Sequence, residues 1–157
     1  MNSAMTTGSM NGKGDCAMSN VNAVDKSGHT MLMDAAKEGD LDGVNDLLRR
    51  GADLEARSNK GKTALHYAAA HGNLDVVNLL LQNGVDLNAR DKDWHTPLML
   101  AAIYGCNHTV QALLNAGADF NAKTLAGNTA MIYAENNNHP LALALLKKAQ
   151  RAKEGTA

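Results

Sequence analysis

Six histidines and two cysteines are the side chains of this 157-residue chain that could ligate a metal ion or activate a nucleophile. Zinc sites and Cys–His nucleophile pairs need such residues at short, defined spacings. Cys16 and Cys106 lie far apart in the sequence and fit neither a disulfide framework nor a metal-ligand pattern. His71, His108 and His139 are expected at or near loops, as surface side chains. We therefore expect no metal, no cofactor and no catalytic residue.

Motifs that carry enzymatic chemistry are also missing from the sequence. No nucleophile elbow, phosphate loop, dinucleotide glycine pattern or His-Glu-x-x-His occurs, and Gly12-Lys13-Gly14 has no strand and helix around it. The cations between residues 147 and 153 suit the end of a helix, whose dipole favours them. With 15 Lys and Arg against 16 Asp and Glu, the net charge is −1. This balance gives no electrostatic case for nucleic acid or an anionic membrane as a partner.

A period of 33 residues organises the chain from residue 21 onwards. The segments 54–86 and 87–119 agree at more than a third of their positions without an insertion. The chain is 45% hydrophobic but only 3% aromatic, which favours closely packed helices. The recurring residues are Thr30, Thr63, Thr96 and Thr129; Ala35, Ala68, Ala101 and Ala134; and Leu47, Leu80, Leu113 and Leu146.

Each period predicts two helices followed by a projecting turn. Thr63 is a suitable N-cap for the first helix, and Gly72 is suited to close it. Apolar residues recur at helical spacing within 74–81 and predict the second helix, which ends at Gly84. The turn-prone residues 91–94 follow. Since one helical hairpin cannot bury its apolar face alone, the copies must stack.

Three segments resemble the ankyrin repeat family. TALHYAA at 63–69 and TPLMLAA at 96–102 are similar to its T-P-L-H-x-A-A signature, and GADFNA at 117–122 is similar to its G-A-D-V-N-A exit. The resemblance implies an all-α solenoid of stacked helix-turn-helix repeats, with projecting β-turns and a concave face. It also implies a structural hydrogen-bonding role for His66. His29 and His95 fall two repeats apart, at about 20 Å, and so cannot share a metal ion.

The repeat register divides the chain into three parts. We expect a disordered N-terminal tail over 1–20, a repeat domain over 21–150, and a C-terminal tail over 151–157. The repeats are 21–53, 54–86, 87–119 and 120–150. Asp34 and Asp46 replace residues of the other copies and are expected to face water, as in a capping repeat. Asn138 stands where the other copies have glycine, and we expect it to adopt the left-handed conformation.

The side chains that the stack does not need for its own burial are expected on the concave face. By the family resemblance these come from the turns and from the pair of residues before each helix-closing glycine. The first two repeats there are rich in cations, and the third and fourth bring apolar and amide groups. The predicted partner-binding residues are Trp94, Tyr104, Ile103, His95, Lys92, Asp93, His71, Lys60, Lys62 and Leu125.

Trp94 replaces Gly28, Gly61 and Gly127 of the other turns. If its backbone has positive φ, this bulky residue costs about 1 kcal/mol or more. One interpretation is that Trp94 is a rigid anchor for a partner. The other is that the turn relaxes and the indole lies against its own repeat.

The sequence thus predicts a non-enzymatic protein-binding module, cytoplasmic and monomeric, whose partner it does not identify. Two alternatives stay open at this point. One is a dedicated inhibitor or immunity-type protein that occludes an enzyme. The other is a self-associating structural unit.

Overall fold

The structure, a computed structural model, describes residues 20–155. Except for Asn20, the tail expected over 1–20 lies outside this range, as do residues 156 and 157. Within it there are eight helices and no strand, apart from an isolated antiparallel bridge between Val24 and Thr30. The helices are α2 (Met31–Glu38), α3 (Leu41–Arg49), α4 (Ala64–Ala70), α5 (Leu74–Gln82), α6 (Pro97–Ile103), α7 (Asn107–Asn115), α8 (Ala130–Asn136) and α9 (Pro140–Gly155).

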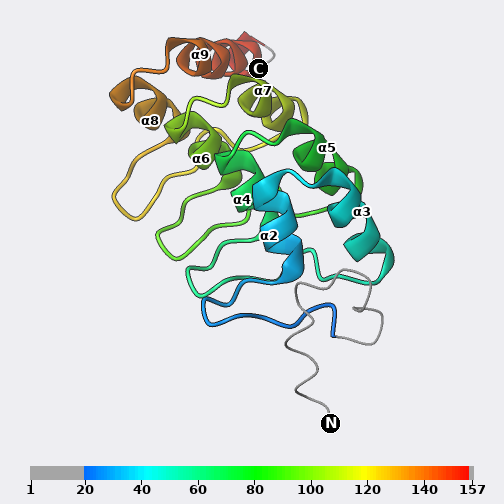
Figure 1. Ribbon diagram of the computed structural model, residues 1–157. Helices are drawn as coiled ribbons and strands as arrows, with labels where there is room; N and C mark the ends of the chain where they lie inside the picture. Colours follow the sequence, from blue (N-terminus) through cyan, green and yellow to red (C-terminus); the bar gives the residue numbers. More distant parts are fainter. Residues whose placement is uncertain (1–19, 156–157) are drawn as a thin grey trace.

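The helices form two rows along the stack. The first helices of the pairs, α2, α4, α6 and α8, pack in order as one row, and α3, α5, α7 and α9 form the other (Figure 1). The turns between successive pairs project from the first row on the same side. The prediction of an all-α repeat solenoid is therefore confirmed.

Local sequence signals begin and end these helices as predicted. Each first helix has a threonine N-cap, and Thr96 Oγ1, for example, accepts a hydrogen bond from the Met99 N–H at 3.3 Å. Gly72 has φ +67°, a conformation open to glycine. Asn138 reaches φ +59° at the equivalent position, as expected. The caps thus hold every first helix in the same register.

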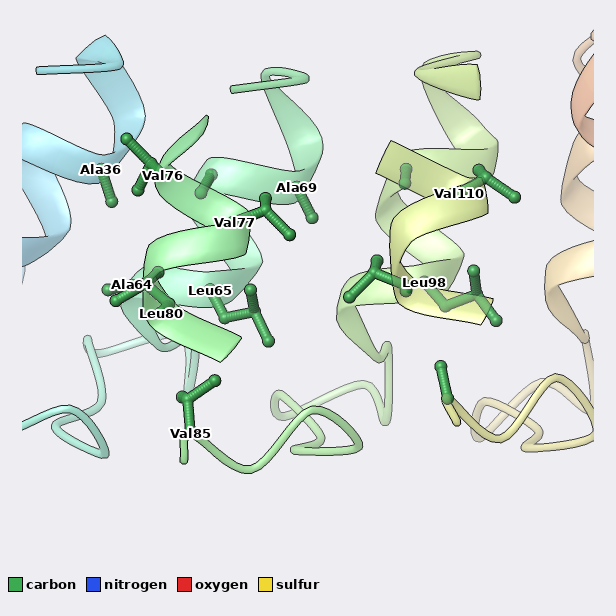
Figure 2. Close-up of a cluster of buried hydrophobic side chains, with 14 of the residues drawn as sticks. Ala36, Ala64, Leu65, Ala69, Val76, Val77, Leu80, Val85, Leu98 and Val110 are labelled. Carbon is green, nitrogen blue, oxygen red and sulfur yellow. The ribbon is translucent and has the colours of Figure 1, made fainter. Parts of the chain in front are cut away.

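The core is a continuous layer of aliphatic side chains between neighbouring repeats. Leu65, Leu80, Leu98 and Val110 are fully buried, and they come from the second and third repeats (Figure 2). Small residues such as Ala69 let the helices of adjacent repeats approach closely. Each repeat therefore depends on its neighbours for its interior.

The two ends of the stack differ from its middle. Asp34 and Asp46 of the first repeat are exposed, as expected for a capping repeat. At the other end, α9 continues as helix through Gly155, across the boundary at which a C-terminal tail was expected. Gln150 stands where the other repeats have a terminating glycine, and the residues after it are good helix formers. The last helix therefore has no signal to stop at residue 150.

Candidate functional site

The projecting turns are closed by a side chain at their first position. We call the four turns (25–29, 58–62, 91–95 and 124–128) the turn tips. Asp91 Oδ1 accepts hydrogen bonds from the backbone N–H groups of Asp93 at 2.9 Å and His95 at 2.8 Å. Asp25 does the same in the first tip, while hydroxyl oxygens of Ser58 and Thr124 serve in the second and fourth. Such turns are held in one conformation before any ligand arrives.

Backbone hydrogen bonds also join each turn tip to the next. The Asn59 N–H donates to Ser27 O at 2.9 Å, and the Lys92 N–H donates to Lys60 O at 3.1 Å. The third link, from the Leu125 N–H to Asp93 O, measures 3.2 Å. The four tips therefore form one continuous ridge along one side of the stack.

An ion pair connects the second and third tips. Lys62 Nζ lies 2.7 Å from Asp91 Oδ2, and the Asp91 side chain is only 1% exposed. Burial opposes ionisation of Asp91, but the Lys62 ammonium and the N–H groups of His95 and Asp93 outweigh it and lower the pKa of this carboxyl. The Lys62 ammonium is thus largely neutralised by a carboxylate of the same protein.

Histidines of the first and third tips reach the next repeat. His29 Nε2 lies 2.8 Å from Tyr67 Oη, and His95 Nε2 lies 3.1 Å from Tyr133 Oη. In both pairs the imidazole also packs against the tyrosine ring. These histidines hold repeats together, and half-burial leaves only part of each ring to meet a partner.

His66 is completely buried and fully hydrogen-bonded. Its Nδ1 accepts from the Thr63 N–H at 3.1 Å, which requires the proton to be on Nε2, and Nε2 donates to His95 O at 2.9 Å. Burial lowers the pKa of His66 to about 4, so the ring is neutral at pH 7. The structural role implied by the family resemblance is confirmed.

Three of the predicted binding residues are large, apolar and exposed. Trp94 is 45% exposed, and Tyr104 and Leu125 are each 62% exposed. Ile103, just before Tyr104, is half-buried. The backbone link from the Leu125 N–H to Asp93 O places Leu125 beside the tip that carries Trp94. The third and fourth repeats therefore present a partly apolar surface.

The polar members of the predicted set divide into two groups. Lys60, Lys92, Asp93 and His71 are exposed, and the imidazole Nδ1 of His71 lies 3.0 Å from the carbonyl oxygen one turn earlier in α4. Lys62 and His95 are the two whose side chains are engaged within the stack.

Trp94 adopts φ +70°, the positive value that its replacement of glycine suggested. The Arg90 guanidinium of the same repeat lies 4.8 Å from the centroid of the indole. The indole thus contacts its own repeat, as the second interpretation expected, but the turn has not relaxed, and Trp94 is 45% exposed. A strained, half-exposed aromatic side chain fixed on a rigid turn also has the properties of an interface anchor.

A hollow of about 490 Å³ lies between the first two tips and the helices α2 and α4. Its wall contains no carboxylate, and sequence reasoning missed Tyr67, which belongs to it. We call it the lysine hollow. It is lined by Lys26, Ser27, His29, Lys37, Asn59, Lys60, Lys62 and Tyr67.

Within residues 20–155, Asp91, Asp93 and His95 form a group whose potential ligand atoms lie within 4.8 Å of one another. This spacing was not predicted as a site from the sequence. Both Asp91 oxygens, however, already accept hydrogen bonds from the turn and from Lys62. A cation bound there would have to displace the Lys62 ammonium, so the arrangement favours the ion pair over a metal ion.

Comparison with known proteins assigns the family. A family model described as ankyrin repeats (3 copies) matches residues 8–91, more than half of the chain, and a second, ankyrin repeats (many copies), matches 80–134. No curated protein matches the chain. None of the helices described in 20–155 is long and apolar enough to cross a bilayer. The chain belongs to the ankyrin repeat family, whose repeats are generally protein–protein interaction modules and typically non-enzymatic.

Proposed function

We propose that this protein is a non-enzymatic module that binds a partner protein through its concave face and turn tips. The observation that carries the proposal is the exposure of Trp94 and Leu125 on a ridge whose backbone is already fixed, with Tyr104 also exposed at the C-terminal end of α6. Exposed aromatic side chains are enriched among residues that dominate interface energies. A rigid ridge loses little conformational freedom on binding, which favours affinity.

The repeat symmetry relates part of this apolar surface to the lysine hollow. Shifting the lysine hollow by two repeats maps Lys37 onto Ile103 and Asn59 onto Leu125. Two of the positions that line the hollow in the first two repeats thus carry large aliphatic side chains in the last two. A surface running over all four repeats is large enough to bury about 800 Å² per partner, as specific complexes do.

Affinity capture from the native source, with the partner identified by mass spectrometry, tests this proposal. The wild type is compared with the double variant Trp94→Ala/Tyr104→Ala, whose helicity is checked by circular dichroism. We expect the variant to bind the captured partner at least tenfold more weakly, since truncating one hot-spot residue typically costs about 2 kcal/mol.

The matched control is Leu41→Ala/Leu141→Ala, which removes two exposed apolar side chains from the outer helices α3 and α9. It should bind as the wild type does. Equal affinity of the Trp94→Ala/Tyr104→Ala variant and the wild type would refute the assignment of the binding face.

A further inference from the structure

The lysine hollow combines three available ammonium groups. Lys26, Lys37 and Lys60 line it, and within residues 20–155 none of them has an ion-pair partner within 4.0 Å. Lys26 and Lys60 come from adjacent turn tips and Lys37 comes from the last turn of α2. The fold therefore gathers these cations from three segments of the chain around one concavity.

The acidic residues near the hollow do not line it. The Asp25 carboxylate accepts hydrogen bonds from the N–H groups of His29 and Ser27 in the first tip, and these bonds lower the pKa of Asp25. The Asp34 carboxylate lies 3.5 Å from Nδ1 of His29. Glu38 follows Lys37 on α2 but does not line the hollow. The lining is thus positive, although the whole chain carries a net charge of −1.

The floor of the hollow is already ordered. Tyr67 donates its hydroxyl proton to Ser58 Oγ at 3.1 Å and lies within hydrogen-bond distance of His29. The Asn59 side-chain amide donates to Lys26 O at 2.9 Å. An anionic group entering here would meet lysines mounted on a fixed backbone, and no turn would need to rearrange.

We propose that the partner presents an extended acidic segment, and that its Asp or Glu carboxylates occupy the lysine hollow. This inference rests on the proposed function, because it names the chemistry of the partner at the same concave face. Charge complementarity selects carboxylates, since Lys26, Lys37 and Lys60 line a wall that contains no acidic residue. The cations of α9 lie at the opposite end of the stack from the lysine hollow.

The position of the apolar surface sets the spacing within that segment. The lysine hollow lies between repeats one and two, and the surface around Ile103 and Leu125 lies two repeats further along. Neighbouring packed helices are about 8 to 10 Å apart, which gives about 16 to 20 Å between the two regions. An extended chain advances about 3.3 Å per residue. The partner segment therefore carries a large apolar residue about five or six positions from its acidic cluster.

A designed peptide tests this inference. It contains four consecutive glutamates, a five-residue Gly/Ser spacer and a Trp-Leu pair, and it carries a fluorescent label; a control peptide has glutamine in place of glutamate. Anisotropy titrations at 50 and 300 mM NaCl give the affinities, and amide chemical shifts locate the site. We expect shifts at Lys26, Lys37 and Lys60, and at least tenfold weaker binding of the glutamine peptide. High salt should also weaken binding of the glutamate peptide.

Variants with matched loss of charge complete the test. Lys26→Gln/Lys37→Gln/Lys60→Gln should weaken binding of the glutamate peptide at least tenfold. Arg49→Gln/Lys147→Gln/Lys148→Gln removes three charges elsewhere, and its affinity for the glutamate peptide should stay within twofold of the wild type. Each of four outcomes would overturn the inference: no binding to the wild type at millimolar peptide, shifts confined to other regions, equal effects of the two variants, or tighter binding of a ten-residue oligothymidylate.

The partner captured with the wild type separates this inference from the proposed function. If the Trp94→Ala/Tyr104→Ala variant loses that partner while the lysine variant keeps it, the proposed binding face is supported and the proposed acidic segment is refuted. If both variants keep the partner, both proposals fail.

Discussion

Asp91 and Lys62 join the second and third repeats through a contact of 2.7 Å between the Lys62 ammonium and the nearly inaccessible Asp91 carboxylate. The same carboxylate closes its own turn through two backbone N–H groups. One buried charge therefore fixes both the conformation of a turn tip and its position relative to the preceding tip.

Lys62→Met should lower the free energy of unfolding by about 2 to 3 kcal/mol. The substitution leaves the Asp91 carboxylate buried without its cation, which costs more than the loss of a surface pair. Urea denaturation at pH 7, followed by circular dichroism, measures the change. Lys60→Met, on the exposed part of the same turn, serves as control and should stay within about 0.5 kcal/mol of the wild type. Similar losses in both variants would show that the ion pair contributes little.

His66 should make the protein less stable as the solution becomes acidic. Its pKa is lowered from 6.5 to about 4 in the folded state, so the unfolded chain binds the extra proton between these values. Stability from this residue is complete above pH 6.5, declines as the pH falls through this window, and declines no further below pH 4. Between pH 7 and pH 5 the expected loss is about 2 kcal/mol.

His66→Met isolates that contribution, because methionine occupies the equivalent positions Met33 and Met99. Urea denaturation of both proteins at pH 7 and pH 5 gives the difference. The variant should lose about 2 kcal/mol less than the wild type over this interval. An identical pH dependence in the two proteins would contradict the assignment.

Trp94→Gly should change the stability by less than about 1 kcal/mol. Glycine relieves the strain of φ +70°, which is worth about 1 kcal/mol, but it loses the Arg90 contact, worth about 0.5 to 1 kcal/mol. Calorimetry measures the balance. Gly61→Ala is the contrasting variant at the equivalent position, where an added Cβ would lie 2.9 Å from Lys92 N. Gly61→Ala should lower the free energy of unfolding by about 1 kcal/mol or more. A larger loss of stability for Trp94→Gly than for Gly61→Ala would show that the indole is mainly structural.

Cys106→Asn should stabilise the protein by about 0.5 to 1.5 kcal/mol. At the equivalent position, Asn73 donates hydrogen bonds to Ala36 O at 2.8 Å and Lys37 O at 2.9 Å. Cys106 offers only a thiol 3.7 Å from Ala70 O. Thermal unfolding measures the gain, and Cys106→Ala should show none. If the asparagine variant unfolds at a lower temperature than the alanine variant, the site does not accept the amide.

The sequence predicted the fold because the same residues perform the same task in every repeat. Thr30, Thr63, Thr96 and Thr129 all cap a helix, and the recurring alanines and leucines lie in one core. The end of α9 was harder to predict. The charged residues after position 150 suggest a tail, but they are good helix formers, and Gln150 stands where the other repeats have glycine.

The contacts of the turn tips could not be predicted from the period. Lys62 and Asp91 are 29 residues apart, and His95 and Tyr133 are 38 apart, so neither pair follows the 33-residue spacing. These pairings depend on the direction in which each tip leans toward the next repeat. The lysine hollow depends likewise on the gap between two repeats. The sequence could indicate cations on this face but not which of them remain available.

The position of Trp94 also makes the protein its own optical reporter. It is the only tryptophan in the chain, and it is half-exposed beside a guanidinium rather than packed in the aliphatic layer. Its emission is therefore expected to respond strongly to a molecule that covers the ridge and only weakly to melting of the interior. Intrinsic fluorescence can follow occupancy of this surface in solution without any label, while loss of structure must be followed by another signal.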